Sequence, residues 1–198
     1  MKRRILSIDF DYFIDTDIDT RNDLFPDGVD EKPKDELNNE WSEMYKNSAE
    51  IVDIGVIDTF ETCCNILKNL RFGKVIIADS HKEIASIFPH LNPKDDLEVI
   101  NIDFHHDNYI SGGLTVDCAN WVRHLMDRFP HTEFTWYRRF DSEMISLEGV
   151  FPYCSTTDFV IEGEFDYIFI CFSPEWTPPH LYPKFKELCQ SVTHLVVE

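Results

Sequence analysis

The chain has 198 residues, 43% of them hydrophobic and 14% aromatic, and this composition is sufficient to bury the core of one domain. Its formal net charge of -19 at pH 7 would repel the phosphates of a nucleic acid, so we expect no nucleic-acid partner. No apolar run is long enough to cross a membrane, and none resembles a secretion signal. The six cysteines are scattered without a C-x-x-C pair, which is typical of reduced thiols in a cytoplasmic protein.

The first expected element is a central strand over residues 4–10, which ends in Asp9 and Asp11. Asp9 falls inside the apolar run, where an unpaired carboxylate is costly, so a cation or a strong hydrogen-bond donor should lie beside it. The alternative is an aspartate that only caps the turn after the strand.

Residues 15–50 hold twelve acidic and four basic side chains, and they predict a long acidic excursion outside the core. Within it, the spacing of apolar residues predicts a surface helix over residues 34–46. A run of charge usually forms a solvated face. The functional alternative is a flap that receives a basic peptide or a guanidinium group.

Strands and helices then alternate. We expect a helix over residues 54–70 that closes at Gly73, a strand over 74–78, a short helix over 82–88 and a strand over 97–102. This order is the signature of parallel strands joined by helices, and it predicts a three-layer α/β/α fold with a mainly parallel central sheet.

The strand over residues 97–102 leads into Asp103, His105 and Asp107. Alternate side chains of an extended chain share a face, so these three can converge on one point while Phe104 turns away. Carboxylates and an imidazole at this spacing indicate a metal site. The alternative is a polar strand end that caps the next element.

The second half of the chain continues the alternation, and its last long strand is followed by Glu175. The further expected elements are a helix over residues 117–129, a strand over 132–137, a hairpin around 148–149, a strand over 166–172, a helix over 181–192 and a strand over 195–197.

Several predicted strands therefore end in ionisable side chains, and the carboxyl ends of parallel strands lie at one edge of a sheet, where ligands bind. Four carboxylates and two imidazoles are too many for one tetrahedral zinc but suit two divalent ions that share aspartates. Mixed oxygen and imidazole ligands favour manganese, with other divalent metals as alternatives. The expected metal ligands are Asp9, Asp11, His81, Asp103, His105 and Asp107.

These motifs resemble the arginase and deacetylase fold. Its ureohydrolase branch carries a D-x-H-x-D motif, matched by residues 103–107, and an S-x-D-x-D motif, matched by residues 7–11. The order is permuted, because the S-x-D-x-D strand comes first here. The chain looks most similar to the arginase-like family that contains the peptide arginases of ribosomal peptide pathways, through residues 79–81, 118–121 and 173–178.

The resemblance implies a single metallohydrolase domain over residues 1–198 that uses two Mn2+ ions. Its substrate would be an arginine-containing peptide or a small guanidinium compound, converted to ornithine and urea. Asp9 and Asp103 would be shared by the ions, and Asp107 could move the proton of the attacking water to the leaving amine. Glu175 would bind the guanidinium group, and Asn120 would line the substrate entrance.

Other functions remain open. Asp9 and Asp11 also resemble the nucleophile motif of haloacid-dehalogenase-type phosphatases, a reading that gives no role to the three ionisable residues after the 97–102 strand. A non-catalytic, metal-stabilised protein could bind a basic peptide on residues 15–50, and amide hydrolysis of the deacetylase type is possible on the same fold. The sequence holds no signal for or against an oligomer.

Overall fold

The computed structural model describes residues 2–26, 32–109, 115–142, 144, 154–156 and 160–193. Its strands are β1 (Lys2–Asp9), β2 (Arg71–Ala78), β3 (Asp96–Ile102), β4 (Thr132–Tyr137), β5 (Cys154–Thr156) and β6 (Glu164–Cys171). They form a six-stranded sheet of order β2-β6-β1-β3-β4-β5, in which all pairs are parallel. The predicted α/β fold with a parallel sheet is therefore confirmed.

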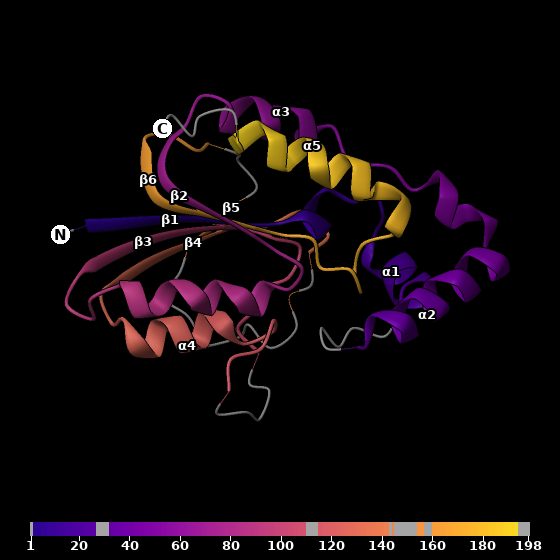
Figure 1. Cartoon of the computed structure of the whole chain (residues 1–198), viewed down its shortest axis with the longest axis horizontal. Coiled ribbons are helices and arrows are strands. Elements are labelled where there is room, and N and C mark those ends of the chain that lie inside the picture. Colours follow the sequence, from indigo (N-terminus) through magenta and orange to yellow (C-terminus); the bar gives the residue numbers. More distant parts are fainter. Residues whose placement is uncertain are drawn as a thin grey trace.

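Helices cover both faces of this sheet (Figure 1). The α-helices are α1 (Ile18–Leu24), α2 (Lys34–Asn47), α3 (Thr59–Leu67), α4 (Trp121–Arg128) and α5 (Tyr182–Thr193). The 3-10 helices are η1 (Phe10–Phe13), η2 (Ala49–Asp53), η3 (His81–His90) and η4 (Pro179–Leu181). Because α3 and α5 pack on one face and η3 and α4 on the other, the sheet separates two apolar cores. This arrangement is the expected three-layer α/β/α fold.

The acidic segment lies beyond the carboxyl ends of the strands, where α1 and α2 project from the sheet (Figure 1). The charge of this segment predicts a place outside the core, and this prediction is wrong. Phe25, Leu37 and Trp41 are buried in the same cluster as α3 and α5, and the rings of Phe25 and Trp41 lie 5.3 Å apart. Apolar side chains therefore dock the segment on the core, although most of its residues are charged or polar.

Several element boundaries differ from those predicted. The helix expected from residue 54 begins at Thr59, because Val56 forms a β-bridge with Ile14. Gly73 lies within β2 and does not end a helix. A Cβ atom at Gly73 would lie 2.9 Å from the carbonyl oxygen of Asp166, so the close approach of β6 explains the glycine. The hairpin around residues 148–149 and the strand over 195–197 lie outside the described residues.

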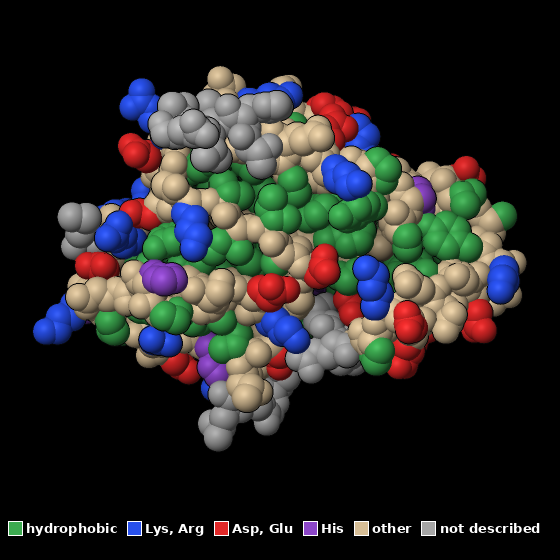
Figure 2. Space-filling view, viewed as in Figure 1, with side chains coloured by type: hydrophobic (Ala, Val, Ile, Leu, Met, Phe, Trp, Pro, Cys, Tyr) green, Lys and Arg blue, Asp and Glu red, His purple; other side chains and the backbone are tan. Residues whose placement is uncertain are grey.

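One face of the molecule carries a band of hydrophobic side chains (Figure 2). In the view of Figure 2, hydrophobic side chains gather along the middle of the face, and acidic and basic side chains lie around them. Within the described ranges, no helix is both long enough and apolar enough to cross a membrane. The five cysteines whose side chains are described are free thiols.

Candidate metal centre

The six side chains expected as metal ligands lie together at the carboxyl edge of the sheet. In sheet order β1 lies beside β3 and β6, and β2 lies on the far side of β6, so strand ends that are distant in sequence become neighbours. The residue with the most accessible side chain is His105, at 13%, and the other five are buried. The group comprises Asp9 at the end of β1, Asp11 just after it, His81 after β2, and Asp103, His105 and Asp107 after β3.

His81 is the centre of the first half of this cluster. Its Nδ1 atom lies 2.9 Å from Oδ2 of Asp107, 3.1 Å from Oδ2 of Asp103 and 3.3 Å from Oδ2 of Asp9. The other ring nitrogen, Nε2, is held at 2.7 Å by the hydroxyl of Ser7. Within the described part of the chain, Nδ1 makes no well-formed hydrogen bond. A buried nitrogen that faces three carboxylates without such a bond has the surroundings of a metal ligand.

His105 is the centre of the second half. Its Nδ1 atom lies 3.0 Å from Oδ2 of Asp11, and that oxygen is buried without a hydrogen-bond partner among the described residues. Ligand atoms of Asp11, Asp103 and His105 lie within 4.8 Å of one another, as do those of His81, Asp103 and Asp107. Asp103 therefore belongs to two groups of three, each large enough to hold an ion.

The expected convergence of Asp103, His105 and Asp107 on one point is wrong. The strand β3 ends at Ile102, so the period-two rule does not extend over these residues. Asp103 and Asp107 face His81, whereas His105 turns to Asp11. The motif thus supplies both halves of the cluster and not a single site.

Neutral donors hold the carboxylates in place. The hydroxyl of Ser173 donates to Oδ2 of Asp9 at 2.6 Å, and the indole N–H of Trp121 donates to Oδ2 of Asp107 at 2.6 Å. Asn101 donates from Nδ2 to Oδ2 of Asp103 at 3.1 Å. Sequence reasoning missed Asn101, although an amide within an otherwise apolar strand, two residues before Asp103, was a usable signal. It also missed Cys171, whose sulfur lies near the ligand atoms of Asp9 and His81.

Backbone strain is concentrated at the same place. Asp107 has a φ of 50° and Ser173 a φ of 47°, and no other non-glycine residue in the described ranges has a positive φ. This conformation costs on the order of 1 kcal/mol or more for a residue with a side chain. Both residues contribute to the cluster, so the strained positions coincide with the site.

The carboxyl groups repel one another. Burial, together with the charge of Asp107, raises the pKa of Asp103 to about 8. Burial and the charge of Asp11 raise the pKa of Asp9 to about 6. Burial also opposes ionisation of Asp11, but the charges of His105 and Arg21 outweigh it and leave the pKa of Asp11 lowered.

The imidazoles respond in the opposite sense. Burial alone would lower the pKa of His105, but the carboxylate of Asp11 raises it to about 9. Burial likewise opposes protonation of His81, but the charge of Asp107 and the nearby carboxylates of Asp103 and Asp9 raise the pKa of His81 well above its usual range. The cluster thus attracts positive charge strongly. Oxygen and imidazole ligands, with two buried ligand atoms lacking hydrogen bonds, fit divalent metal ions.

The two residues expected to contact substrate lie in different settings. Glu175 is buried in the turn after β6, between Ser173, which binds Asp9, and Trp176, whose ring centroid lies 4.7 Å from that of His105. Asn120 is also buried, but its amide binds backbone: Nδ2 donates to the Thr115 carbonyl at 3.2 Å, and Oδ1 accepts from the Asp117 N–H at 2.9 Å. These bonds shape the turn before α4.

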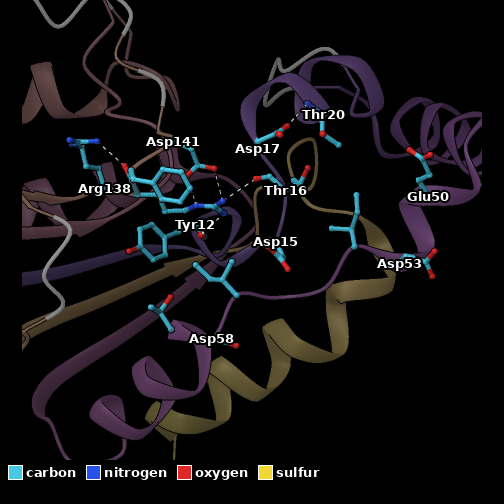
Figure 3. A pocket seen from close by; sticks show the side chains of 15 residues that line it. Tyr12, Asp15, Thr16, Asp17, Thr20, Glu50, Asp53, Asp58, Arg138 and Asp141 are labelled. Atoms are coloured by element: carbon cyan, nitrogen blue, oxygen red, sulfur yellow. Dashed lines mark hydrogen bonds and ion pairs between the residues drawn. The ribbon is translucent and has the colours of Figure 1, made fainter.

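A pocket of about 910 Å³ opens where the segments after β1 and β4 meet the start of α3 (Figure 3). Tyr12, which directly follows Asp11, lies in its wall, and Arg139 binds Asp141 through two hydrogen bonds of 2.9 and 2.7 Å. Its acidic lining residues are Asp15, Asp17, Glu50, Asp53, Asp58 and Asp141.

Comparisons of the chain with protein-family models, with curated proteins and with solved structures found no match. The fold and the site define a parallel α/β protein with a buried cluster of four carboxylates and two imidazoles at the carboxyl edge of its sheet.

Proposed function

We propose that the protein is a hydrolase that uses two divalent ions to hydrolyse the guanidinium group of an arginine residue within a peptide. The products are urea and an ornithine residue. The observation that carries this proposal is the position of Asp103 in two of the three groups of potential ligands. A carboxylate shared between two groups of three can bring two ions close together, as a two-metal hydrolytic site needs.

The chain offers a ligand set for each ion. Asp11, Asp103 and His105 would hold one ion, and His81, Asp103 and Asp107 would hold the other, with Asp9 beside His81. Carboxylate and imidazole ligands favour Mn2+. When bound, such ions supply the Lewis acidity that lowers the pKa of a water molecule.

Asp107 is the best-placed group for moving a proton. It lies at the strained start of the segment that leads to α4, and Trp121 fixes one of its oxygens. In the proposed reaction, the carboxylate of Asp107 accepts a proton from the attacking water and delivers it to the departing amine.

Glu175 is the proposed group for binding the guanidinium. A buried carboxylate can accept two parallel hydrogen bonds from the flat guanidinium fork. The residues around it, Ser173 and Trp176, both contact candidate metal ligands, so Glu175 belongs to the turn that borders the centre.

The acidic segment supports a peptide rather than free arginine as the substrate. Trp41 on α2 donates its indole N–H to the carbonyl oxygen of Pro174 at 2.8 Å, which ties the segment to the Glu175 turn. The pocket of Figure 3 adds carboxylates of this segment, among them Asp15 and Asp17, next to the turn that follows β1. Basic residues that flank the target arginine would be attracted to this surface.

The test is urea release from an arginine-containing peptide with added Mn2+, with free arginine in parallel. We expect urea from the wild type and none from Asp103→Ala. The matched control is Asp96→Ala, which removes an exposed carboxylate at the opposite end of β3 and should leave urea release unchanged.

A different reaction product would support a different function. Phosphate released from a phosphomonoester would favour the phosphatase that uses Asp9 and Asp11, and acetate released from an acetylated lysine peptide would favour amide hydrolysis. Binding of a basic peptide without any product would favour a non-catalytic, metal-stabilised protein.

A further inference from the structure

Two arginines from distant parts of the chain meet at the turn that carries Asp11. Arg21 lies on α1 with no exposed surface, and Arg139 follows β4 with 9% exposed. Removing a charged group from water costs several kcal/mol unless protein groups replace the solvent. The groups that surround each guanidinium therefore indicate what it stabilises.

Both guanidinium groups bind backbone oxygens of the turn over residues 11–16. Arg21 donates from Nη2 to the carbonyl of Asp11 at 2.7 Å and to that of Ile14 at 3.4 Å. Arg139 donates from Nη1 to the same Ile14 oxygen and from Nη2 to the carbonyl of Thr16 at 3.1 Å. The backbone of this turn is thus held from two sides.

The same two groups contact the ring of Phe104. The Cζ atom of Arg21 lies 3.8 Å from the ring centroid, and that of Arg139 lies 5.3 Å from it. Phe104 stands between Asp103 and His105, and its own N–H lies 3.5 Å from Oδ1 of Asp11. The arginines therefore join the two segments that supply Asp11, Asp103 and His105.

The two charges are compensated differently. Arg139 forms a two-bond pair with Asp141, and both residues line the pocket. Arg21 lies with Nη1 3.5 Å from Oδ2 of Asp11. Its Nε and Nη1 atoms make no hydrogen bond within the described residues. The polar contacts of the Arg21 guanidinium are therefore with the turn that carries Asp11.

We propose that Arg21 is a positioning residue for the ion bound by Asp11, Asp103 and His105, and that Arg139 braces the same turn. This inference rests on the metal centre of the proposed function. The guanidinium group supplies no ligand. It fixes the backbone that aims Asp11 at His105, so its loss weakens one of the two ion sites and spares the site around His81.

Charge alone predicts the opposite result. A guanidinium near a metal cation repels it, so removal of the charge without any loss of position would tighten binding. The hydrogen bonds to the Asp11 and Ile14 carbonyls favour the positioning role, because the bond from Arg21 to the Asp11 backbone is shorter than its distance to the carboxylate.

The test measures Mn2+ binding to Arg21→Met and Arg21→Lys by calorimetry, together with the electron paramagnetic resonance spectrum. In Arg21→Met we expect the Kd of one ion to rise about 10–100-fold while the other stays at the wild-type value. The spectrum should change from that of a coupled ion pair to that of an isolated ion. Arg21→Lys keeps the charge but cannot bridge both carbonyls, so we expect a smaller change in the same direction.

Arg139→Met keeps the inference testable if the Arg21 variants do not fold, because Arg139 lies nearer the surface. Its expected effect has the same direction. The matched control is Arg123→Met, an exposed arginine on α4, with binding as in the wild type. Two ions bound with wild-type or tighter affinity by folded Arg21→Met and Arg139→Met would overturn this inference alone. A wild type that binds no ion would contradict the proposed function, and this inference with it.

Discussion

The indole N–H of Trp121 donates a hydrogen bond of 2.6 Å to the carboxylate of Asp107, and this bond attaches the last residue of the candidate centre to α4. The side chains lie fourteen positions apart, and both are buried. The contact links the packing of a helix directly to the geometry of a proposed ligand. It therefore predicts that a conservative change in the core alters metal binding.

Trp121→Phe keeps an aromatic ring in the core but removes this donor. We expect the variant to lose about 1–3 kcal/mol of unfolding free energy, because Asp107 loses a bond in a buried site. We also expect Mn2+ affinity to fall about 10–100-fold, as measured by calorimetry. Trp41→Phe is the matched control, since it removes an indole donor that binds Pro174, and it should leave Mn2+ affinity unchanged. Equal affinities for wild type and Trp121→Phe would show that the bond does not orient the ligand.

The metal-free protein should lose stability as the pH rises from about 6 to 9. Folding raises the pKa of Asp103 to about 8 and that of His105 to about 9, above unfolded values of about 3.9 and 6.5. The folded state therefore binds more protons than the unfolded state in this window, and this contribution to stability is lost as the pH rises through the folded pKa values.

Thermal unfolding in the presence of a chelator, measured across this pH range, checks the prediction. Saturating Mn2+ should raise the melting temperature and reduce the slope with pH, because the ligands are then held deprotonated by the ions. A metal-free protein that becomes more stable between pH 6 and 9 would contradict the assigned electrostatics.

Ser173 combines a strained backbone with a hydrogen bond to Asp9, and two substitutions separate these contributions. Ser173→Ala removes the hydroxyl and keeps the side chain at a φ of 47°, whereas Ser173→Gly removes the hydroxyl and relieves the strain. We expect the glycine variant to be more stable than the alanine variant by about 1 kcal/mol. Chemical denaturation gives the comparison. An alanine variant as stable as the glycine variant would mean that the backbone is not strained there.

Glu175→Gln tests the proposed guanidinium contact without a change in size. A charge-assisted hydrogen bond to the substrate is worth about 1.5–3 kcal/mol, so we expect kcat/KM for urea release to fall about 10–100-fold. Metal content should stay at the wild-type level, because Glu175 is not among the proposed ligands. Elemental analysis beside the kinetic assay measures both. Loss of bound metal in this variant would instead assign Glu175 to the metal centre.

Much of this fold follows from local sequence patterns. The apolar runs of β1, β3 and β6 and the spacing in α2 and α5 mark their elements, because burial of one face or of a whole strand leaves a direct signal. The alternation of strands and helices then predicts a parallel sheet, and the parallel sheet predicts that strand ends meet. All six expected ligands lie at that edge for this reason.

The internal geometry of the cluster could not be predicted in the same way. The division of Asp103, His105 and Asp107 between the two halves of the cluster depends on where β3 ends and on the left-handed backbone at Asp107. The alternation of side chains along an extended chain predicts neither feature. Arg21 lies in an acidic segment that looked exposed, yet its guanidinium is buried against Phe104. Such contacts depend on pairs of residues far apart in sequence.

A titration of chelator-treated protein with Mn2+, followed by native mass spectrometry, measures whether two ions share Asp103. We expect two ions bound per wild-type chain, and loss of both from Asp103→Ala at the same Mn2+ concentration, with Asp96→Ala behaving as the wild type. No specifically bound ion in the wild type, or two ions retained by folded Asp103→Ala, would rule out a centre in which two ions share this carboxylate.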